Sequence, residues 1–183
     1  MRRLVGALRR DATGIAAVEF ALIAPLMIVL YFGLSEATLA LMAEKRASHL
    51  ASTMADLIAQ EQQTDAASLG ELVSAAPAIM RPFSSDSARL KLRVTSLVAD
   101  SHGDAKVAWS YASAGQSRRT RGSGVPEMPA DLLAPTEGVV LAEVTYEHRP
   151  IVGMVLRETL QFNERFYLRP RRTNQVTCPD CPA

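Results

Sequence analysis

The stretch Gly14-Ile-Ala-Ala-Val-Glu-Phe-Ala-Leu-Ile-Ala-Pro-Leu-Met-Ile-Val-Leu-Tyr-Phe-Gly-Leu34 is long and apolar enough to cross a membrane. As a helix that rises about 1.5 Å per residue it measures roughly 31 Å, and a bilayer hydrocarbon core is about 30 Å thick. Pro25 cannot donate the backbone hydrogen bond that the Ala21 carbonyl would accept, so we expect a bend there. The sequence therefore predicts a transmembrane helix over residues 15–35.

Basic residues are unevenly distributed around this apolar run. Four arginines precede it, whereas the first basic residue after it is Lys45. Because positively charged flanks tend to stay in the cytoplasm, residues 1–14 are predicted to form a cytoplasmic leader, and the chain after the helix is predicted to be exported. The four arginines are Arg2, Arg3, Arg9 and Arg10.

Glu19 is the one charged residue inside the run. A charge at mid-bilayer costs about 2.5–3.5 kcal/mol on insertion scales, so a plain anchor gains nothing from it. Cleavage after Gly14 would create an α-amino group on Ile15, mostly charged at neutral pH and roughly 6 Å along the helix axis from Glu19. The carboxylate can then pair with that amine in its own chain or in a neighbouring one. The alternative interpretation is that Gly14 is not a cleavage site but an ordinary glycine at the start of a helix whose N-cap is Thr13.

The residues around Gly14 resemble a known family. Arg-Arg-Asp-Ala-Thr-Gly14, followed by Ile-Ala-Ala-Val-Glu19-Phe20-Ala-Leu and Pro25-Leu, is similar to the start of TadE-like (TadE/TadG-type) minor pseudopilins of tight-adherence (Flp, type IVb) pilus systems. The TadE-like segment covers about residues 10–55, and the resemblance extends over most of the chain in pattern, but only the first forty residues carry motif-grade specificity. It implies cleavage between Gly14 and Ile15 by a prepilin peptidase, which makes Glu19 the fifth mature residue. It also implies that Glu19 and Phe20 act in assembly.

The same resemblance implies where the protein resides and what it contacts. The expected location is the bacterial inner membrane, with a periplasmic C-terminal domain, and the resemblance leaves open whether the protein enters a pilus. The expected partners are other pilus subunits, assembly-platform proteins and the prepilin peptidase. Two alternatives stay open from the residues alone. One is an uncleaved, inner-membrane-anchored periplasmic binding or sensory domain, and the other is a secreted enzyme released by signal peptidase after Ala40.

The exported part begins with helical patterns. Apolar residues recur from Leu39 to Ile58, so one helix is expected to continue from the membrane to about Glu61. Asp65 is a candidate N-cap of a second helix that ends near Met80. The segment from Pro150 to Leu156 is apolar but too short to span a bilayer, and it can rest on the long helix or on lipid headgroups.

Alternating patterns predict four strands after these helices. The first two form a hairpin around the turn residues 100–104, and the third is apolar enough on both faces to be central. The fourth carries Glu158 and Glu164 on its apolar face, so we expect it to be twisted, bulged or partly exposed. The expected strands cover residues 89–95, 106–111, 139–146 and 156–168, and in the second strand Val107, Trp109 and Tyr111 are expected on one face. The basic loop at Arg118–Arg121 is expected to be a solvated surface loop.

The remaining chemistry-bearing residues do not form a catalytic pattern. Cys178 and Cys181 are predicted to form a local disulfide in an oxidising compartment, because a zinc site would need two further ligands. His49, His102 and His148 are scattered, and the last two are expected to be exposed. The sequence contains no nucleophile elbow, phosphate loop or zinc-protease motif. We therefore expect neither an enzyme nor a cofactor, metal or small-molecule substrate.

Composition and order together give the predicted architecture. Twenty basic and nineteen acidic residues leave a net charge of +1, which does not indicate a nucleic-acid partner. The expected parts are the leader at 1–14, the transmembrane helix at 15–35, a periplasmic pilin-like domain at 36–172 and a cysteine-containing tail at 173–183. The predicted fold is α+β, with a long N-terminal helix, a second helix and a roughly four-stranded antiparallel sheet.

Overall fold

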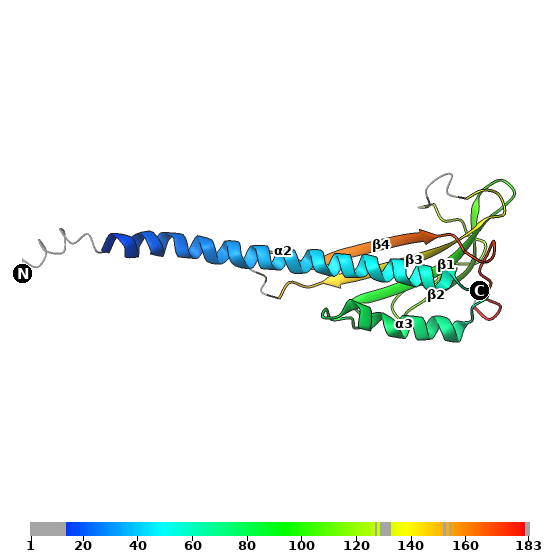
Figure 1. The fold of residues 1–183 in the computed structure, drawn as a ribbon, viewed down its shortest axis with the longest axis horizontal. Coiled ribbons are helices and arrows are strands. Elements are labelled where there is room, and N and C mark those ends of the chain that lie inside the picture. Colours follow the sequence, from blue (N-terminus) through cyan, green and yellow to red (C-terminus); the bar gives the residue numbers. More distant parts are fainter. Residues whose placement is uncertain (1–13, 127, 129–132, 152, 154, 182–183) are drawn as a thin grey trace, which may run out of the picture. The chain divides into compact units, whose positions relative to one another are not determined.

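The computed structural model describes residues 14–126, 128, 133–151, 153 and 155–181. The four leader arginines and Thr13 lie outside the described residues. The chain divides into two units, one formed by residues 1–39 with Pro150–Glu158 and the other by residues 40–149 with 159–183. The element order is α2, α3, β1, β2, β3 and β4 (Figure 1).

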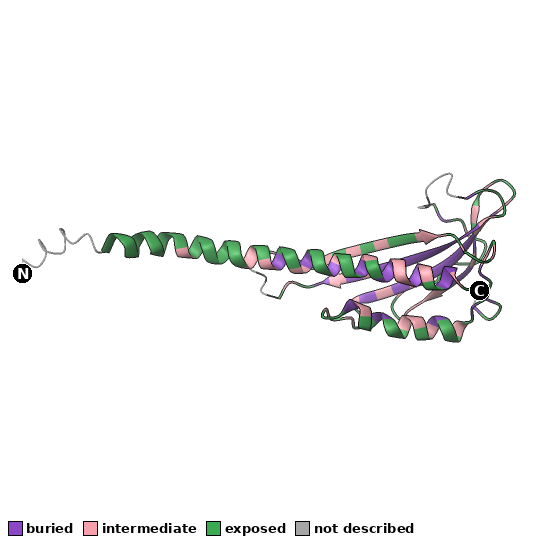
Figure 2. Ribbon diagram, viewed as in Figure 1, coloured by how far each residue is buried: buried purple, intermediate pink, exposed green. Residues whose placement is uncertain are grey.

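The long helix α2 runs without interruption over Ile15–Ala59, including Pro25. Its first part has no buried residue before Glu36, whereas from Ala40 a buried residue recurs every three or four positions (Figure 2). This change from uniform exposure to an amphipathic stripe marks the passage from one unit to the other. The predicted helix that continues beyond the apolar run is confirmed, and it ends two residues before Glu61.

The second unit is built on a four-stranded antiparallel sheet in the order β2-β1-β3-β4. Its strands are β1 at Leu90–Ala99, β2 at Ala105–Ala112, β3 at Gly138–His148 and β4 at Leu160–Leu168. The predicted α+β fold, the hairpin and the central place of β3 are confirmed. In the hairpin turn, the Asp100 carboxylate accepts hydrogen bonds from the backbone N–H groups of His102 and Asp104, at 2.9 and 3.0 Å.

Helices α2 and α3 cover the same face of this sheet. Helix α3 spans Ala66–Met80, and Asp65 caps it by accepting a 2.7 Å hydrogen bond from the Ser68 N–H. That hydrogen bond lowers the pKa of Asp65, as expected for an anion at a helix start. The largest fully buried side chains on this face form the main core: Leu50, Met54, Leu69, Met80, Leu92, Val94, Trp109, Val140 and Tyr146.

The opposite face of the sheet carries a second, smaller core that the sequence patterns do not reveal. Side chains from the long β2–β3 connection, Val125 and Leu133, pack there against Leu97, Val107 and Leu141. Val107 reaches this face because the β1–β2 register shifts between Ser96 and Leu97, so that Leu97 pairs with Val107 and Ser96 with Trp109. The expected single-face alternation of Val107 with Trp109 is therefore wrong, and a β-bulge is the reason.

Two further expectations require correction. The fourth strand begins at Leu160 rather than at Leu156, because Pro150–Glu158 belongs to the first unit. Strand β4 itself contains no fully buried residue, which confirms the predicted partial exposure of the fourth strand. His148, expected to be exposed, is 5% exposed, with the rings of Phe83 and Phe162 near it. Burial and the nearby Arg89 charge lower its pKa, because both disfavour the imidazolium form.

Candidate functional site

The predicted processing residues lie where the long helix starts. Gly14 immediately precedes α2, and a Cβ built on it would meet nothing within 4 Å. Ile15, the first residue of the helix, is 57% exposed. Among the described residues, none packs closely on Gly14, at the end of the helix where the predicted cleavage would fall.

Glu19 and Phe20 follow about one helical turn later, and both side chains are exposed. Within the part of the chain that the structure describes, no residue donates a hydrogen bond or forms an ion pair with the Glu19 carboxylate. Phe20 is 72% exposed, among the most exposed large apolar side chains of the helix. An acid beside an exposed aromatic ring on an apolar helix leaves both groups available to a partner.

The surface around these residues is apolar for the whole first part of α2. One described helix is long and apolar enough to cross a membrane, and its most apolar window is 0% buried. A shallow groove on it is lined mainly by Met27, Leu30, Tyr31 and Leu34. The large exposed apolar side chains are Ile15, Val18, Phe20, Leu22, Ile23, Leu26, Met27, Ile28, Val29, Leu30, Tyr31 and Leu34. Exposure on this scale is compatible with lipid or with other helices, but not with water.

At the end of the apolar run, Glu36 is a buried acid. It is 3% exposed, and its Oε2 accepts hydrogen bonds from the backbone N–H groups of Val155 and Leu156, at 3.2 and 3.0 Å. One helical turn earlier, Gly33 faces Val155: a Cβ at Gly33 would come within 3.0 Å of Val155 Cγ2. The segment Pro150–Glu158 thus rests on the helix, a choice that the sequence left open.

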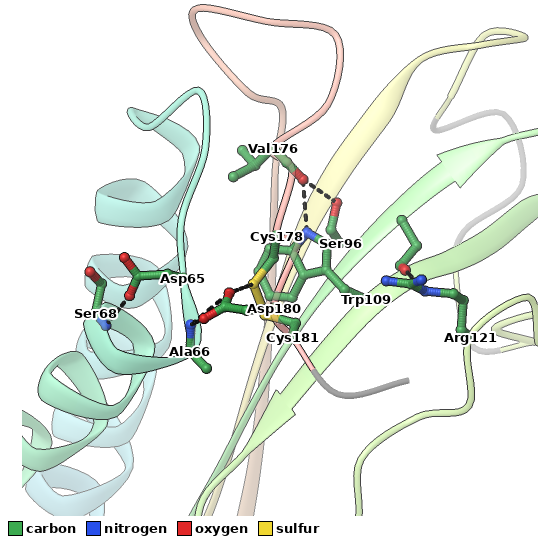
Figure 3. The surroundings of a disulfide bond; sticks show 11 residues. Asp65, Ala66, Ser68, Ser96, Trp109, Arg121, Val176, Cys178, Asp180 and Cys181 are labelled. Carbon is green, nitrogen blue, oxygen red and sulfur yellow. Dashed lines mark hydrogen bonds between the residues drawn. A yellow bond between two sulfur atoms is a disulfide. The ribbon is translucent and has the colours of Figure 1, made fainter.

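The cysteine-containing tail packs into the second unit. Cys178 and Cys181 form a disulfide, and both belong to the main core together with Val176 (Figure 3). The Val176 carbonyl accepts a 2.8 Å hydrogen bond from Trp109 Nε1, and Thr177 forms a parallel bridge with Gln63. The tail is therefore held by the core and by the chain between the two helices.

The disulfide predicts the behaviour of the exported protein toward thiol reagents. We expect no maleimide labelling of the full-length protein until a reductant is added. Cys178→Ser should expose one reactive thiol and lower the free energy of unfolding by about 2 kcal/mol, the chain-entropy value for so short a loop. Denaturant unfolding of wild type with and without reductant provides the matched comparison. Labelling of the unreduced exported protein would contradict the predicted oxidised state.

The basic loop is only partly the solvated surface that the sequence suggested. Arg118 and Arg121 are exposed, but the Arg119 side chain is 14% exposed and donates to the Glu143 carboxylate. Its Nη2 lies 2.9 Å from Oε1 and its Nε lies 3.3 Å from Oε2. Arg121 Nε donates to the Ala108 carbonyl at 2.7 Å. The loop is therefore fixed to the sheet by its arginines.

The Glu143 carboxylate lies close to three arginine side chains from different parts of the second unit, Arg93, Arg119 and Arg165. Arg93 donates to it from Nε at 2.6 Å and from Nη2 at 2.9 Å, and Arg165 Nε lies 3.6 Å from Oε1. Burial alone would raise the pKa of Glu143, but the hydrogen bonds and charges of Arg93 and Arg119 outweigh it and lower the pKa. This arrangement binds and neutralises a carboxylate inside the protein, so we interpret it as structural.

Among the described residues, one apolar helix is long enough to span a membrane and it continues into an α+β domain, which is consistent with a single-pass membrane anchor. The family model described as TadE-like protein matches residues 14–56, which include Gly14, Glu19, Phe20, Pro25 and Glu36. This part of the chain is therefore TadE-like, and the resemblance drawn from its sequence is confirmed over these residues. The comparisons with curated proteins and with solved structures find no match.

Proposed function

We propose that this protein is a minor pilin-like membrane subunit that takes part in the assembly of a tight-adherence (Flp, type IVb) pilus. The TadE-like segment implies involvement in such a system. The observation that carries the finer proposal is the exposed apolar helix with Glu19 five positions after an open Gly14–Ile15 bond. The role is structural and not catalytic: the helix packs among the helices of other pilus subunits, and the second unit supplies contacts outside the membrane.

Processing gives Glu19 its function in this proposal. Cleavage after Gly14 leaves a charged amine on Ile15 at the membrane surface. When a subunit moves into a bundle of apolar helices, an unpaired charge is strongly unfavourable, whereas an amine–carboxylate pair reduces the cost for both groups. Glu19 of one chain and Ile15 of its neighbour then align when the helices are shifted by about one turn. Phe20 adds apolar contact beside the pair.

Membrane orientation follows from the leader. Its four arginines favour a cytoplasmic N-terminus in the bacterial inner membrane, which places the second unit in the periplasm. That placement agrees with the disulfide, because thiols pair in an oxidising compartment. It also puts the Gly14–Ile15 bond on the cytoplasmic side, within reach of a membrane-embedded prepilin peptidase.

Cleavage is tested on the mature N-terminus. In cells that contain the prepilin peptidase, we expect the purified protein to begin at Ile15 by intact mass and N-terminal sequencing. Gly14→Val should reduce processing at least about ten-fold, because a β-branched side chain restricts the extended backbone that glycine allows at the cut. Gly6→Val, the same substitution elsewhere in the leader, is the matched control and should be cleaved normally.

The other outcomes separate the rival functions. A wild-type protein that begins at Met1 is an uncleaved anchor, and the proposed assembly role through a new amine is then wrong. An N-terminus between Glu36 and Lys45 identifies a secreted product of signal peptidase. In that case α2 is no membrane anchor, and the pilus proposal fails as a whole.

A further inference from the structure

The segment Pro150–Glu158 carries two large apolar side chains that are exposed. Its sequence from Pro150 to Leu156 contains no charged residue. Ile151 is 82% exposed and Val155 is 49% exposed. Exposing a large aliphatic side chain instead of burying it forgoes about 1.5–3 kcal/mol. Two such side chains in one short loop therefore call for an environment other than water.

This loop is attached to the long helix at one defined place. The Glu36 carboxylate accepts the backbone N–H groups of Val155 and Leu156, and Val155 also packs on Gly33. Glu36 is almost fully buried by this arrangement. Because a buried carboxylate needs hydrogen bonds, the two N–H groups and the acid hold each other in place.

The attachment point coincides with the end of the membrane-spanning stretch. No charged residue lies between Glu19 and Glu36, and most side chains from Phe20 to Leu34 are apolar and exposed. Gly33 and Glu36 lie roughly 27 and 32 Å along the helix axis from Ile15, which is the thickness of a hydrocarbon core. The loop is thus held where hydrocarbon gives way to lipid headgroups on the exported side.

We propose that this loop is a second membrane contact, with Ile151 and Val155 inserted at the boundary between headgroups and acyl chains of the exported leaflet. Glu36 is the positioning residue that keeps the loop against the helix. Arg157, which is exposed and next to the apolar stretch, reaches the lipid phosphates in the manner of interfacial basic side chains. The proposal rests on α2 spanning the membrane, and it is independent of cleavage at Gly14 and of pilus assembly.

Lipid is the occupant that fits this surface. The exposed side chains of the loop continue the apolar surface of the helix beside them, which lipid already covers in a spanning orientation. Ile151 and Val155 alone are too few to form a protein interface, since a stable interface buries roughly 800 Å² on each side. The functional consequence is a fixed depth and rotation of the helix in the bilayer, so that Glu19 is presented at a constant level.

The test places a nitroxide on the full-length protein, reconstituted alone in nanodiscs of phosphatidylcholine and phosphatidylglycerol under non-reducing conditions. Three variants are compared, each with one added cysteine beside the intact native disulfide: Ile151→Cys in the loop, Leu26→Cys as the lipid reference and His102→Cys as the water reference. We expect the label at 151 to be at least about three-fold less accessible to a water-soluble nickel chelate than the label at 102, because interfacial segments lie 5–10 Å into the boundary. Its accessibility to oxygen should exceed that of the label at 102.

Each other result overturns a defined part of the proposal. Equal nickel accessibility at 151 and 102 means that the loop lies in water. Low accessibility to both oxygen and nickel at 151 means that protein covers it, as in a dimer. A label at 26 that is open to nickel shows that α2 does not span the bilayer, and the proposed function then fails with the inference. Lipid exposure at 26 with water exposure at 151 rejects the inference alone.

A second variant tests the positioning role of Glu36. In the Ile151→Cys background, Glu36→Ala should broaden the range of depths at position 151 and increase nitroxide mobility, because the loop loses its acceptor. Glu44→Ala removes an acid two turns further along the same helix and is the matched control, with no change expected. If Glu36→Ala keeps wild-type depth and mobility, Glu36 does not position the loop.

Discussion

Replacing Glu143 with glutamine is expected to lower the free energy of unfolding by about 3–5 kcal/mol, the usual cost of leaving buried charges without their partner. For a unit of this size, the midpoint of thermal unfolding should fall by about 10–15 °C. The shape of the side chain is preserved, but the charge that Arg93 and Arg119 share is lost. The side chains of Arg93 and Arg119 are 15% and 14% exposed, so water solvates their charges poorly once the carboxylate is lost.

The full-length protein in detergent, followed by circular dichroism during heating and in denaturant, measures this effect. Glu147→Gln is the matched control, because Glu147 lies on the same strand and pairs with Lys91 at 3.7 Å, with both side chains 28% exposed. Such a partly solvated pair is worth about 1 kcal/mol or less. If Glu143→Gln and Glu147→Gln lower the free energy of unfolding equally, the cluster around Glu143 stabilises the protein no more than a partly solvated ion pair does.

The same cluster predicts a pH dependence with a definite sign. Because the pKa of Glu143 is lower in the folded protein than in the unfolded chain, its contribution is present above the unfolded pKa. That contribution is lost as the pH falls through the folded pKa. The stability gap between wild type and Glu143→Gln should therefore be constant near neutral pH and should narrow below about pH 4.5, near the ordinary value of a glutamic acid.

The sequence predicted those features that depend on neighbours along the chain. The apolar run, the Asp65 cap and the turn at residues 100–104 each rely on a few consecutive residues, and the structure contains all three. The strands followed from alternating side chains. Glu143 was missed because its partners Arg93, Arg119 and Arg165 are far apart in sequence and occupy positions that read as solvent-facing.

Long-range packing explains the other gaps. The tail reads as a polar terminus, yet Val176 enters the core because its carbonyl binds the Trp109 indole from another strand. The attachment of Pro150–Glu158 to Glu36 likewise joins residues more than one hundred positions apart. Glu36 looked like the first polar residue beyond the membrane, and no local pattern distinguishes a solvated acid from one that accepts two backbone hydrogen bonds.

Replacing Glu19 with alanine is expected to reduce surface pili and adhesion to the level of a strain that lacks the protein. Insertion into the membrane should be unchanged or improved, because the apolar helix loses a charge that costs up to about 2.5–3.5 kcal/mol. Assembly suffers because the Ile15 amine of a processed subunit then enters the helix bundle without a counter-charge. A penalty of about 3 kcal/mol lowers the assembly equilibrium more than a hundred-fold.

Comparison with a second variant separates this role from a general defect. Glu71→Ala removes an exposed acid on α3 and should leave piliation intact. Normal piliation with Glu19→Ala would exclude the proposed pairing, provided that immunoblotting finds the protein in the membrane. Because the pairing requires the new amine, adding Glu19→Ala to Gly14→Val should remove only the assembly that the residual cleaved subunits still support. If adding Glu19→Ala removes more assembly than that residual cleaved fraction supports, Glu19 acts in a way that does not depend on cleavage, and its partner must be sought elsewhere than at Ile15.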